Sequence, residues 1–366
     1  MKIALDATEA AYPEPTGTGV YSQKLIRTLA ASRPAELPAD VRFALCVRIG
    51  PYWRWGRRKD WPAGCSVFPV WEPWLPPPRA ALFHGLNQRL PRRSYSVSVV
   101  TVHDLFPLTS TEYSAPSFQK RFTEILQDAV ARADRIITVS NATREQLLQH
   151  TNASDARIRV IHHGVDPIPT ASPEEQREFR RQVLGLAEEE KFFLNVGVIQ
   201  TRKNIANIVL AAARLPSYRL VLAGGDGYGA EAIHALIGKE GMSGRVVRLG
   251  HASPETLRLL YSTATALVFP SFEEGFGIPV LEAMSSGLPV ITSNCSAMPE
   301  VAGDAAVWVD PHNVAQIASA MRHLAEDASL AAGLRELGRK RAAAFSWEKC
   351  ARETWQVYEQ ALREHG

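Results

Sequence analysis

The sequence FPSFEEGFGIPVLEA, at residues 269–283, passes from the end of a strand through a loop into a helix. Phe269 ends a short apolar run, as expected for a buried strand. Gly275 and Gly277 lie in the loop that follows, and Pro279 suits the first turn of a helix. This order of elements is typical of α/β proteins with parallel sheets.

Two carboxylates flank the glycines: Glu274 lies in the loop, and Glu282 lies near the start of the helix. Backbone N–H groups at a helix N-terminus bind phosphate, and glycines allow a ligand to come close to the backbone. Fixed carboxylates accept hydrogen bonds from sugar hydroxyls. The segment therefore predicts a site for a diphosphate and a sugar. The alternative is an ordinary helix N-terminus, where the helix dipole stabilises acidic residues without any ligand.

Short apolar runs alternate with longer helical segments along the chain, which predicts βαβ units. We expect strands at residues 3–5, 42–47, 97–102, 136–139 and 159–161, and then at residues 192–196, 219–222, 245–248, 266–269, 290–292 and 306–309. Apolar residues from Phe118 to Ala133 recur at helical spacing and predict one buried helix face. Residues 313–363 are expected to be helical, with breaks near Gly333 and Ser346.

Residues 167–173 contain three prolines, which cannot continue a helix or a central strand. They predict a hinge-like linker between two α/β halves, and a chain of 366 residues is long enough for two domains with a core each. Ligands of open parallel sheets bind at the carboxyl ends of the strands. We therefore expect a ligand cleft between the halves.

The charge is unevenly distributed, although the net charge is only +3. Residues 1–166 carry 21 Lys and Arg against 15 Asp and Glu, whereas residues 167–366 carry 20 against 23. Basic and aromatic residues are interleaved in residues 42–61. This stretch predicts contact with an anionic membrane surface or a polyprenyl-diphosphate-linked acceptor, with an exposed loop as the alternative. We expect no nucleic-acid partner.

The four cysteines are scattered and lack the spacing of a zinc site or a disulfide framework, which favours reduced thiols. No apolar run reaches the ~18 residues needed to span a bilayer, and the N-terminus lacks the pattern of a signal peptide. We therefore expect a cytoplasmic protein, peripheral on the inner face of the cytoplasmic membrane if residues 42–61 touch it.

Seven groups of motifs occur along the chain in a fixed order. They are LDA (5–7) with GTGVY (17–21), FHG (83–85), TVHDL (101–105), ITVS (137–140), HGVD (163–166), NVG (195–197) with RKN (202–204), and the stretch 249–311 with its Glu-x7-Glu pair. Together they resemble the retaining glycosyltransferases of family 4, also called group 1, which have the GT-B fold.

The resemblance implies an α/β GT-B fold of two Rossmann-like domains whose parallel sheets face a central cleft. We expect an acceptor-binding domain at residues 1–168, a nucleotide-sugar-binding domain at residues 174–346, and a terminal helix at residues 347–366 that packs back on the first domain. Relatives of this kind use a nucleoside diphosphate sugar as co-substrate, with no cofactor and no bound metal ion.

The resemblance also implies site residues. The expected catalytic residues are His103, Arg202, Lys203 and Glu274. The expected donor-binding residues are Gly17, Thr18, Gly19, Leu249, Gly275, Phe276, Gly277 and Glu282. Arg202 and Lys203 would neutralise the diphosphate, and the two glutamates would hold the transferred sugar and the ribose. A solvated Arg-Lys pair and a structural histidine are the alternatives. This chain has Val198 where some relatives carry a further arginine.

Residues 5–21 and 101–108 look most like bacterial mannosyltransferases of surface-polysaccharide biosynthesis, which implies GDP-mannose as the donor and a glycan or lipid-linked acceptor. UDP-glucose, or another UDP-hexose, is the alternative donor. An epimerase or a nucleotide-sugar-binding protein on the same fold is the alternative of another class. A nicotinamide dehydrogenase is disfavoured because no Gly-x-Gly-x-x-Gly directly follows the first strand.

Overall fold

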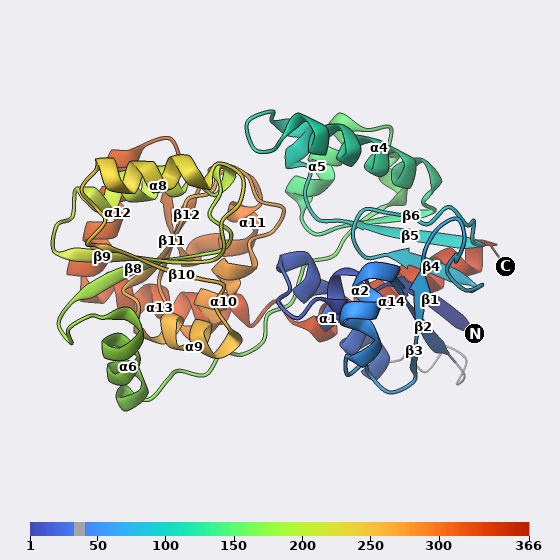
Figure 1. Ribbon diagram of the computed structural model, residues 1–366, viewed down its shortest axis with the longest axis horizontal. Coiled ribbons are helices and arrows are strands. Elements are labelled where there is room, and N and C mark those ends of the chain that lie inside the picture. Colours follow the sequence, from blue (N-terminus) through green and yellow to red (C-terminus); the bar gives the residue numbers. More distant parts are fainter. Residues whose placement is uncertain (33–40, 366) are drawn as a thin grey trace. The chain divides into compact units, whose positions relative to one another are not determined.

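The chain folds into two compact α/β units in the computed structural model, which describes residues 1–32 and 41–365 (Figure 1). The first unit comprises the described parts of Met1–Thr109, Pro116–Gly164 and Phe345–Gly366, and the second comprises Ser110–Ala115 and Val165–Ala344. The C-terminal segment thus returns to the first unit. Residues 33–40 of the expected first domain and Gly366 of the expected terminal helix lie outside the described residues.

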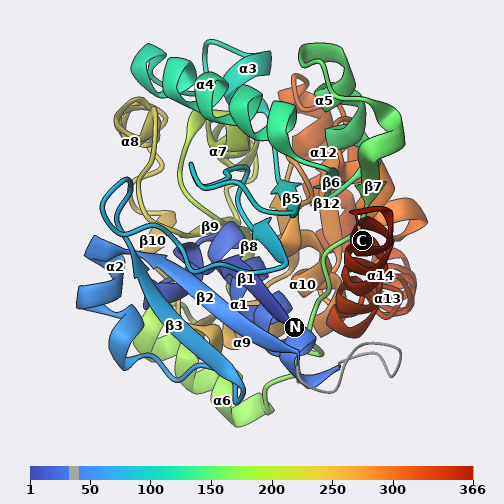
Figure 2. The same ribbon diagram turned by 90° about the vertical axis from the view of Figure 1, so that its right-hand side faces the viewer.

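The first unit is built on a parallel seven-stranded sheet with the order β3-β2-β1-β4-β5-β6-β7 (Figure 2). The five expected strands are confirmed, with ends that differ by at most one residue. The sequence does not indicate β3 and β4, because β3 is an edge strand that contains Pro69 and β4 is short and ends at Gly85. The strands are β1 (Lys2–Asp6), β2 (Arg42–Arg48), β3 (Cys65–Val70), β4 (Leu82–Gly85), β5 (Val97–Val102), β6 (Arg135–Thr138) and β7 (Ile158–Val160).

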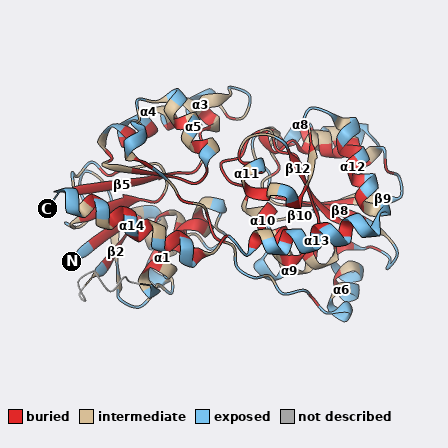
Figure 3. Ribbon diagram, turned by 180° about the vertical axis from the view of Figure 1, so that it is seen from behind, coloured by how far each residue is buried: buried red, intermediate tan, exposed pale blue. Residues whose placement is uncertain are grey.

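Helices cover both faces of this sheet (Figure 3). They are α1 (Gly17–Ala31), α2 (Ile49–Arg54), α3 (Phe106–Thr109), α4 (Pro116–Arg132), α5 (Asn141–His150) and α14 (Trp347–His365), with short 3-10 segments at Glu9–Ala11, Gly56–Arg58 and Asp155–Arg157. Leu5 packs in one core with α1 and α14, and Ala4 packs in the other with α4 and α5. Because successive side chains of a strand point to opposite faces, β1 contributes to both cores.

α4 carries the apolar face expected between Phe118 and Ala133, with one difference. Leu126 and Ala129 are completely buried in the core, whereas Phe118 is 49% exposed. Phe118 lies in the first turn of α4, where its ring packs on Phe122, with the ring centroids 6.2 Å apart. The expected buried face therefore begins at Phe122.

A buried hydrogen-bond chain attaches the terminal helix α14 to the sheet. Tyr358 OH lies 2.6 Å from Nδ1 of His84, and Nε2 of His84 lies 2.8 Å from Oγ1 of Thr101. Thr101 also bonds to Tyr21 OH of α1, at 3.0 Å. Burial, with a smaller contribution from His103, lowers the pKa of His84 to about 3, so this histidine is a neutral structural residue.

The second unit holds a parallel six-stranded sheet with the order β10-β9-β8-β11-β12-β13. All six expected strands are confirmed, with ends that differ by at most two residues. The strands are β8 (Lys191–Val196), β9 (Tyr218–Ala223), β10 (Val246–Gly250), β11 (Ala266–Phe269), β12 (Val290–Ser293) and β13 (Val307–Val309). The helices are α6 (Pro173–Phe179), α7 (Ile205–Ala213), α8 (Ala230–Lys239), α9 (Pro254–Thr263), α10 (Ile278–Ser286), α11 (Met298–Ala302), α12 (Val314–Glu326) and α13 (Ala328–Ala342), with short helical segments at Arg180–Leu184, Thr201–Lys203 and Gly303–Ala305.

The C-terminal helical region breaks at Asp327, so the break expected near Gly333 is wrong. The carboxylate of Asp327 caps α13 by accepting a hydrogen bond from Leu330 N at 2.9 Å. Gly333 lies inside α13 at an exposed position. The break expected near Ser346 is confirmed, since α14 begins at the next residue.

The proline-rich residues 167–173 belong to the second unit. Oγ of Ser285 donates to the carbonyl of Asp166 at 3.0 Å and accepts from the backbone N–H of Ile168 at 3.3 Å. The boundary between the units falls before this segment, at residues 164–165. The proline-rich stretch is therefore hydrogen-bonded to the second unit along part of its length.

The cysteines are free thiols, and Cys46 and Cys350 are buried in the first unit. Burial raises the pKa of both thiols, so neither is a reactive thiolate at neutral pH. Among the described residues, no helix combines the length and the apolar character needed to cross a membrane.

Gly164 packs against the backbone at the start of α14 and generates a prediction. A Cβ on Gly164 would lie 2.2 Å from Trp347 N, so Gly164→Ala should destabilise the protein by about 1–3 kcal/mol. Gly333→Ala is the control, because its Cβ enters open space on an exposed helix, and it should stabilise by about 0.5–1 kcal/mol. Urea denaturation followed by circular dichroism measures both variants. Equal effects of the two substitutions would contradict this packing.

Candidate active site

The expected donor residues of the second unit gather at the carboxyl ends of two neighbouring strands. β8 ends at Val196 and is followed by the Thr201–Lys203 turn, and β11 ends at Phe269 and is followed by the loop that carries Glu274. β8 and β11 are paired in parallel, so their carboxyl ends meet at one edge of the sheet. This is the edge where open α/β sheets bind ligands.

Glu274 forms ion pairs with two cations at this edge. Its Oε2 lies 3.0 Å from a terminal nitrogen of Arg202, and its Oε1 lies 2.7 Å from Nζ of Lys203. All three residues are buried, with exposed fractions of 6% for Arg202 and 8% for Lys203 and Glu274. The alternative of a solvated Arg-Lys pair is therefore wrong. We call these three residues the charge cluster.

The carboxylate of Glu274 is ionised because of its partners. Burial alone would raise its pKa, but the charges of Arg202 and Lys203 outweigh this effect and lower the pKa to about 2. A carboxylate held in this way accepts hydrogen bonds and donates none. With two cations and one anion, the charge cluster keeps one net positive charge.

The loops around the charge cluster are locked to each other by Asn204. This residue adopts a left-handed conformation with φ 59°, which asparagine tolerates better than most residues. Its Nδ2 donates to the carbonyls of Pro270 and Pro311, at 2.9 Å and 2.7 Å. Arg202 is held too, because its guanidinium donates to the carbonyl of Glu273. The cations are therefore fixed in position before any ligand arrives.

Ser296 fixes the backbone of Glu274 and is a site residue that sequence reasoning missed. Its Oγ accepts from Glu274 N at 3.0 Å and donates to Glu274 O at 2.7 Å. Ser296 is a single serine 22 residues further along the chain, so no local motif points to it.

The remaining residues of the predicted phosphate loop lead into α10. Gly277 has φ 95° and is the N-cap of α10, and a Cβ at this position would lie 2.5 Å from the Met298 side chain. Gly275 precedes it, and the side chain of Phe276 is buried. The loop thus places backbone groups, not long side chains, at the start of the helix.

Glu282 lies on α10 and accepts a hydrogen bond from Tyr261 OH of α9 at 2.7 Å. Tyr261 is buried, and it also escapes sequence reasoning, because a lone tyrosine near the end of a helix carries no signal. Leu249 lies at the carboxyl end of the edge strand β10, next to Gly250, whose φ is 65°. Glu282 and Leu249, which are expected to bind the nucleotide, thus belong to elements that meet at the carboxyl end of the sheet.

In the first unit, the expected donor-binding residues Gly17, Thr18 and Gly19 form the first turn of α1. Gly19 is needed for packing, since a Cβ there would lie 2.7 Å from the Pro15 side chain and 2.9 Å from the carbonyl of Glu9. The turn still presents backbone N–H groups at a helix N-terminus.

His103 follows directly after β5 and is buried in the first unit. Its Nε2 donates to the carbonyl of Leu86 at 2.8 Å, and its ring packs edge-on against Tyr21, with ring centroids 4.7 Å apart. Burial lowers its pKa to about 4, so the ring is neutral at pH 7. Because Nε2 carries the proton, Nδ1 is an acceptor, and it has no hydrogen-bond partner within the described part of the chain.

Comparisons with known proteins match both halves of the chain. The family model Glycosyltransferase Family 4 matches residues 26–168, and the model Glycosyl transferases group 1 matches residues 176–341. The O-antigen chain mannosyltransferase B of Escherichia coli is 32% identical over 284 residues, which are 76% of this chain and 74% of that protein. The chain belongs to the group 1 glycosyltransferases, family 4.

Solved structures share the whole fold. Sucrose-phosphate synthase from Thermosynechococcus elongatus matches 98% of both chains with a TM-score of 0.77 and 22% identity. Anabaena HepE in complex with UDP-glucose matches 98% of this chain and 99% of its own, with a TM-score of 0.76 and 18% identity. The expected fold of two Rossmann-like domains, GT-B, is confirmed.

A further relative by sequence is the D-inositol 3-phosphate glycosyltransferase of Mycobacterium tuberculosis. It is 34% identical over 250 residues, and the match spans 51% of its length.

The charge cluster generates a stability prediction. Glu274→Gln removes the carboxylate that pairs with two buried cations and should destabilise the protein by about 3–5 kcal/mol at neutral pH. The pKa of Glu274 is lower in the folded protein than its ordinary 4.5, so the advantage of the wild type is complete above pH 4.5 and shrinks as the pH falls towards 2.

Urea denaturation at several pH values measures this difference. Glu255→Gln is the control, because Glu255 is exposed and its partner Arg258 also pairs with Glu175, so the loss of this carboxylate should have little effect. A wild-type advantage that stays constant or grows on acidification would contradict the ion-paired state of Glu274.

Proposed function

We propose that this glycosyltransferase transfers mannose from GDP-mannose, with retention, to a glycan or lipid-linked acceptor in surface polysaccharide biosynthesis. The charge cluster is the observation that carries the proposal, because its net positive charge suits the binding of a donor diphosphate. The mannose assignment is supported by the name of the Escherichia coli relative. UDP-glucose is the second candidate donor, supported by the complex of HepE with that nucleotide sugar.

In this proposal the departing nucleoside diphosphate is stabilised by fixed positive charge. Arg202 and Lys203 face the diphosphate, and the backbone N–H groups of residues 275–277 add hydrogen bonds at the start of α10. The first turn of α1, with Gly17 and Thr18, offers further N–H groups. Fixed donors of this kind take over the role of a divalent cation. Across the described residues no three His, Cys, Asp or Glu side chains cluster as metal ligands, and metal-independent transfer remains a prediction.

The two glutamates have different tasks in the proposal. Glu274 is an ionised acceptor beside the cations and holds hydroxyls of the transferred sugar. Its ion pairs make it a poor nucleophile, because attack would remove the charge that neutralises Arg202 and Lys203. Glu282, oriented by Tyr261, accepts hydrogen bonds from the ribose hydroxyls, and Leu249 offers backbone atoms to the base.

Retention follows if the reaction proceeds on one face of the sugar. The acceptor oxygen bonds to the anomeric carbon from the side of the leaving group, the bond to the phosphate oxygen breaks, and that oxygen takes the acceptor proton. His103 is neutral, and in this proposal it lies close to the reacting carbon of the transferred sugar. Catalysis then consists of orientation and charge stabilisation.

We further propose that residues 42–61 contact an anionic membrane. Trp53 is 57% exposed and lies near Arg57, whose guanidinium is 5.1 Å from its ring centroid. Trp61 is different, since its indole N–H donates to the carbonyl of Gly56 and its ring packs on the core. Trp53 and its basic neighbours therefore form the contact. Flotation with vesicles rich in anionic lipid tests it, and the absence of co-flotation would refute it.

A transfer assay tests the proposed function. The protein is incubated with GDP-α-mannose or UDP-α-glucose and a panel of lipid-linked glycans, and the product is analysed by NMR. We expect an α-linked mannose, because retention preserves the configuration of the donor. A β-linked product would refute retention, and transfer from UDP-glucose alone would replace mannose by glucose. Binding of nucleotide sugars without transfer to any acceptor would favour a binding protein.

A further inference from the structure

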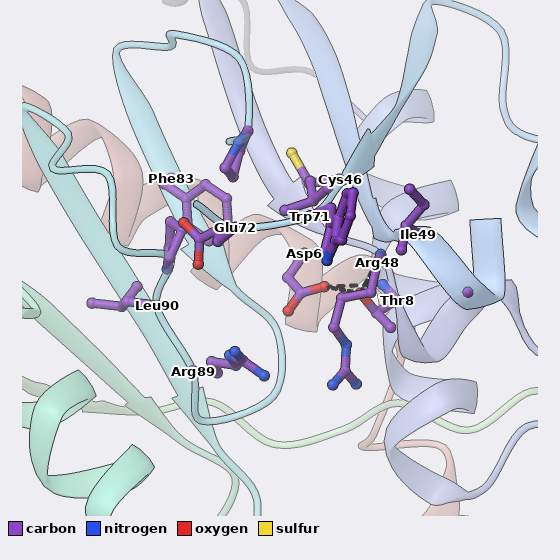
Figure 4. Close-up of a pocket in the computed structure, with 14 residues that line it drawn as sticks. Asp6, Thr8, Cys46, Arg48, Ile49, Trp71, Glu72, Phe83, Arg89 and Leu90 are labelled. Carbon is purple, nitrogen blue, oxygen red and sulfur yellow. Dashed lines mark hydrogen bonds between the residues drawn. The ribbon is translucent and has the colours of Figure 1, made fainter. Parts of the chain in front are cut away.

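The first unit contains a cavity of about 260 Å³ that the donor site does not use (Figure 4). It lies at the carboxyl ends of β1, β2 and β3, where Asp6 and Arg48 end their strands and Trp71 follows β3. Glu72 and Arg89 complete its polar lining. The cavity is smaller than the ~300–1,000 Å³ of sites for drug-sized ligands, so its size suits a single sugar residue.

The loop that carries Arg89 is held rigidly by its neighbours. A Cβ at Gly85 would lie 1.9 Å from the carbonyl oxygen of Arg89, so only glycine allows this close approach. The backbone N–H of Gln88 donates to the carbonyl of Thr101 at 2.8 Å, and Arg132 donates to the carbonyl of Pro91 at 2.7 Å. The backbone of Arg89 is therefore fixed from both sides of the loop, which reduces the backbone entropy lost on binding.

The charged side chains around the cavity differ in how many hydrogen bonds and ion pairs they form. One oxygen of Asp6 accepts two hydrogen bonds from Thr8, and one oxygen of Glu72 accepts from Arg92 N at 2.7 Å. Arg48 also lines the cavity, but it pairs at 3.2 Å with Glu9, which does not line it. Arg89 is half-buried, yet across the described residues its guanidinium has no hydrogen bond or ion pair. A partly desolvated guanidinium without a partner favours an anion, which it can bind with two hydrogen bonds.

Trp71 supplies an aromatic surface at the edge of the cavity. The residue is 55% exposed, and its backbone is fixed in a turn by two hydrogen bonds with Leu75, at 2.8 Å and 2.7 Å. An exposed indole presents an apolar ring face beside the charged residues that line the cavity. Carboxylates, a guanidinium and an indole together match the hydroxyls, the anionic group and the apolar face of a charged sugar.

We propose that this cavity binds an anionic sugar residue of the acceptor, with Arg89 as the residue that selects its charge. Arg89 binds the carboxylate or phosphate of that sugar, the remaining oxygens of Asp6 and Glu72 accept from its hydroxyls, and Trp71 covers its apolar face. The assignment to an acceptor rests on the proposed function. The preference for an anionic sugar rests on the cavity alone.

Ligand-observed NMR titration of the full chain tests the proposal with three probes: glucuronate, mannose 6-phosphate and neutral methyl α-mannoside. We expect the wild type to bind at least one anionic probe about tenfold more tightly than the neutral one, as a charged hydrogen bond implies. Arg89→Gln should remove this difference, whereas Arg89→Lys should keep part of it. Arg92→Gln is the matched control, since Arg92 is exposed on the same loop and its side chain does not line the cavity.

Binding of glucuronate alone identifies a carboxylate sugar, and binding of mannose 6-phosphate alone identifies a phosphorylated one. Equal affinity for the neutral probe, an unchanged preference in Arg89→Gln, or no binding of either anionic probe overturns the proposal. Thermal unfolding verifies that each variant is folded. The wild type is titrated separately with GDP and UDP. A chain that binds anionic sugars but neither nucleotide would refute the proposed function and not the cavity.

Discussion

The buried contact of Glu274 with Arg202 and Lys203 is the constraint on which the second unit's site depends. Two buried cations need a counter-ion, because removing charge from water is costly unless it is paired. One carboxylate meets this need only in part, and the charge cluster keeps one positive charge. In the proposed function, this remaining positive charge attracts the donor diphosphate. Asn204 and Ser296 hold the two loops so that neither has to reorganise first.

The first unit depends on a different buried contact. The chain from Tyr358 through His84 and Thr101 to Tyr21 connects the terminal helix, two strands and α1. Because the terminal helix closes this core, the first unit is complete only after the second has been synthesised. Tyr21 also packs on His103, so the same chain of contacts supports the residue that we place near the reacting carbon.

The sequence predicts much of the fold, for a physical reason. Central parallel strands are buried on both faces, so β11 and the Phe-Phe-Leu run of β8 stand out as apolar. β3 does not stand out, because an edge strand tolerates Pro69 and exposed positions. Gly333 misleads because an exposed glycine can lie within a helix when the break is set by a capping residue, here Asp327.

The candidate site is predictable only where a motif carries it. Glu274 and Lys203 belong to motifs, but nothing in their spacing shows that they form an ion pair. They lie 71 residues apart in the sequence and come together because β8 pairs with β11. Tyr261 and Ser296 are single polar residues whose partners are set by tertiary packing. Arg89 is similar, because its loop is identified by contacts of Gly85 and Gln88 that no sequence pattern encodes.

The most direct measurement of the central claim is the affinity for nucleoside diphosphates relative to monophosphates, by calorimetry, in the wild type and in Lys203→Gln. If the charge cluster binds the donor diphosphate, the wild type should prefer GDP over GMP, or UDP over UMP, by about tenfold or more. The Lys203→Gln variant should lose most of that preference while binding the monophosphate as before. An equal preference for the diphosphate in both proteins would contradict the account.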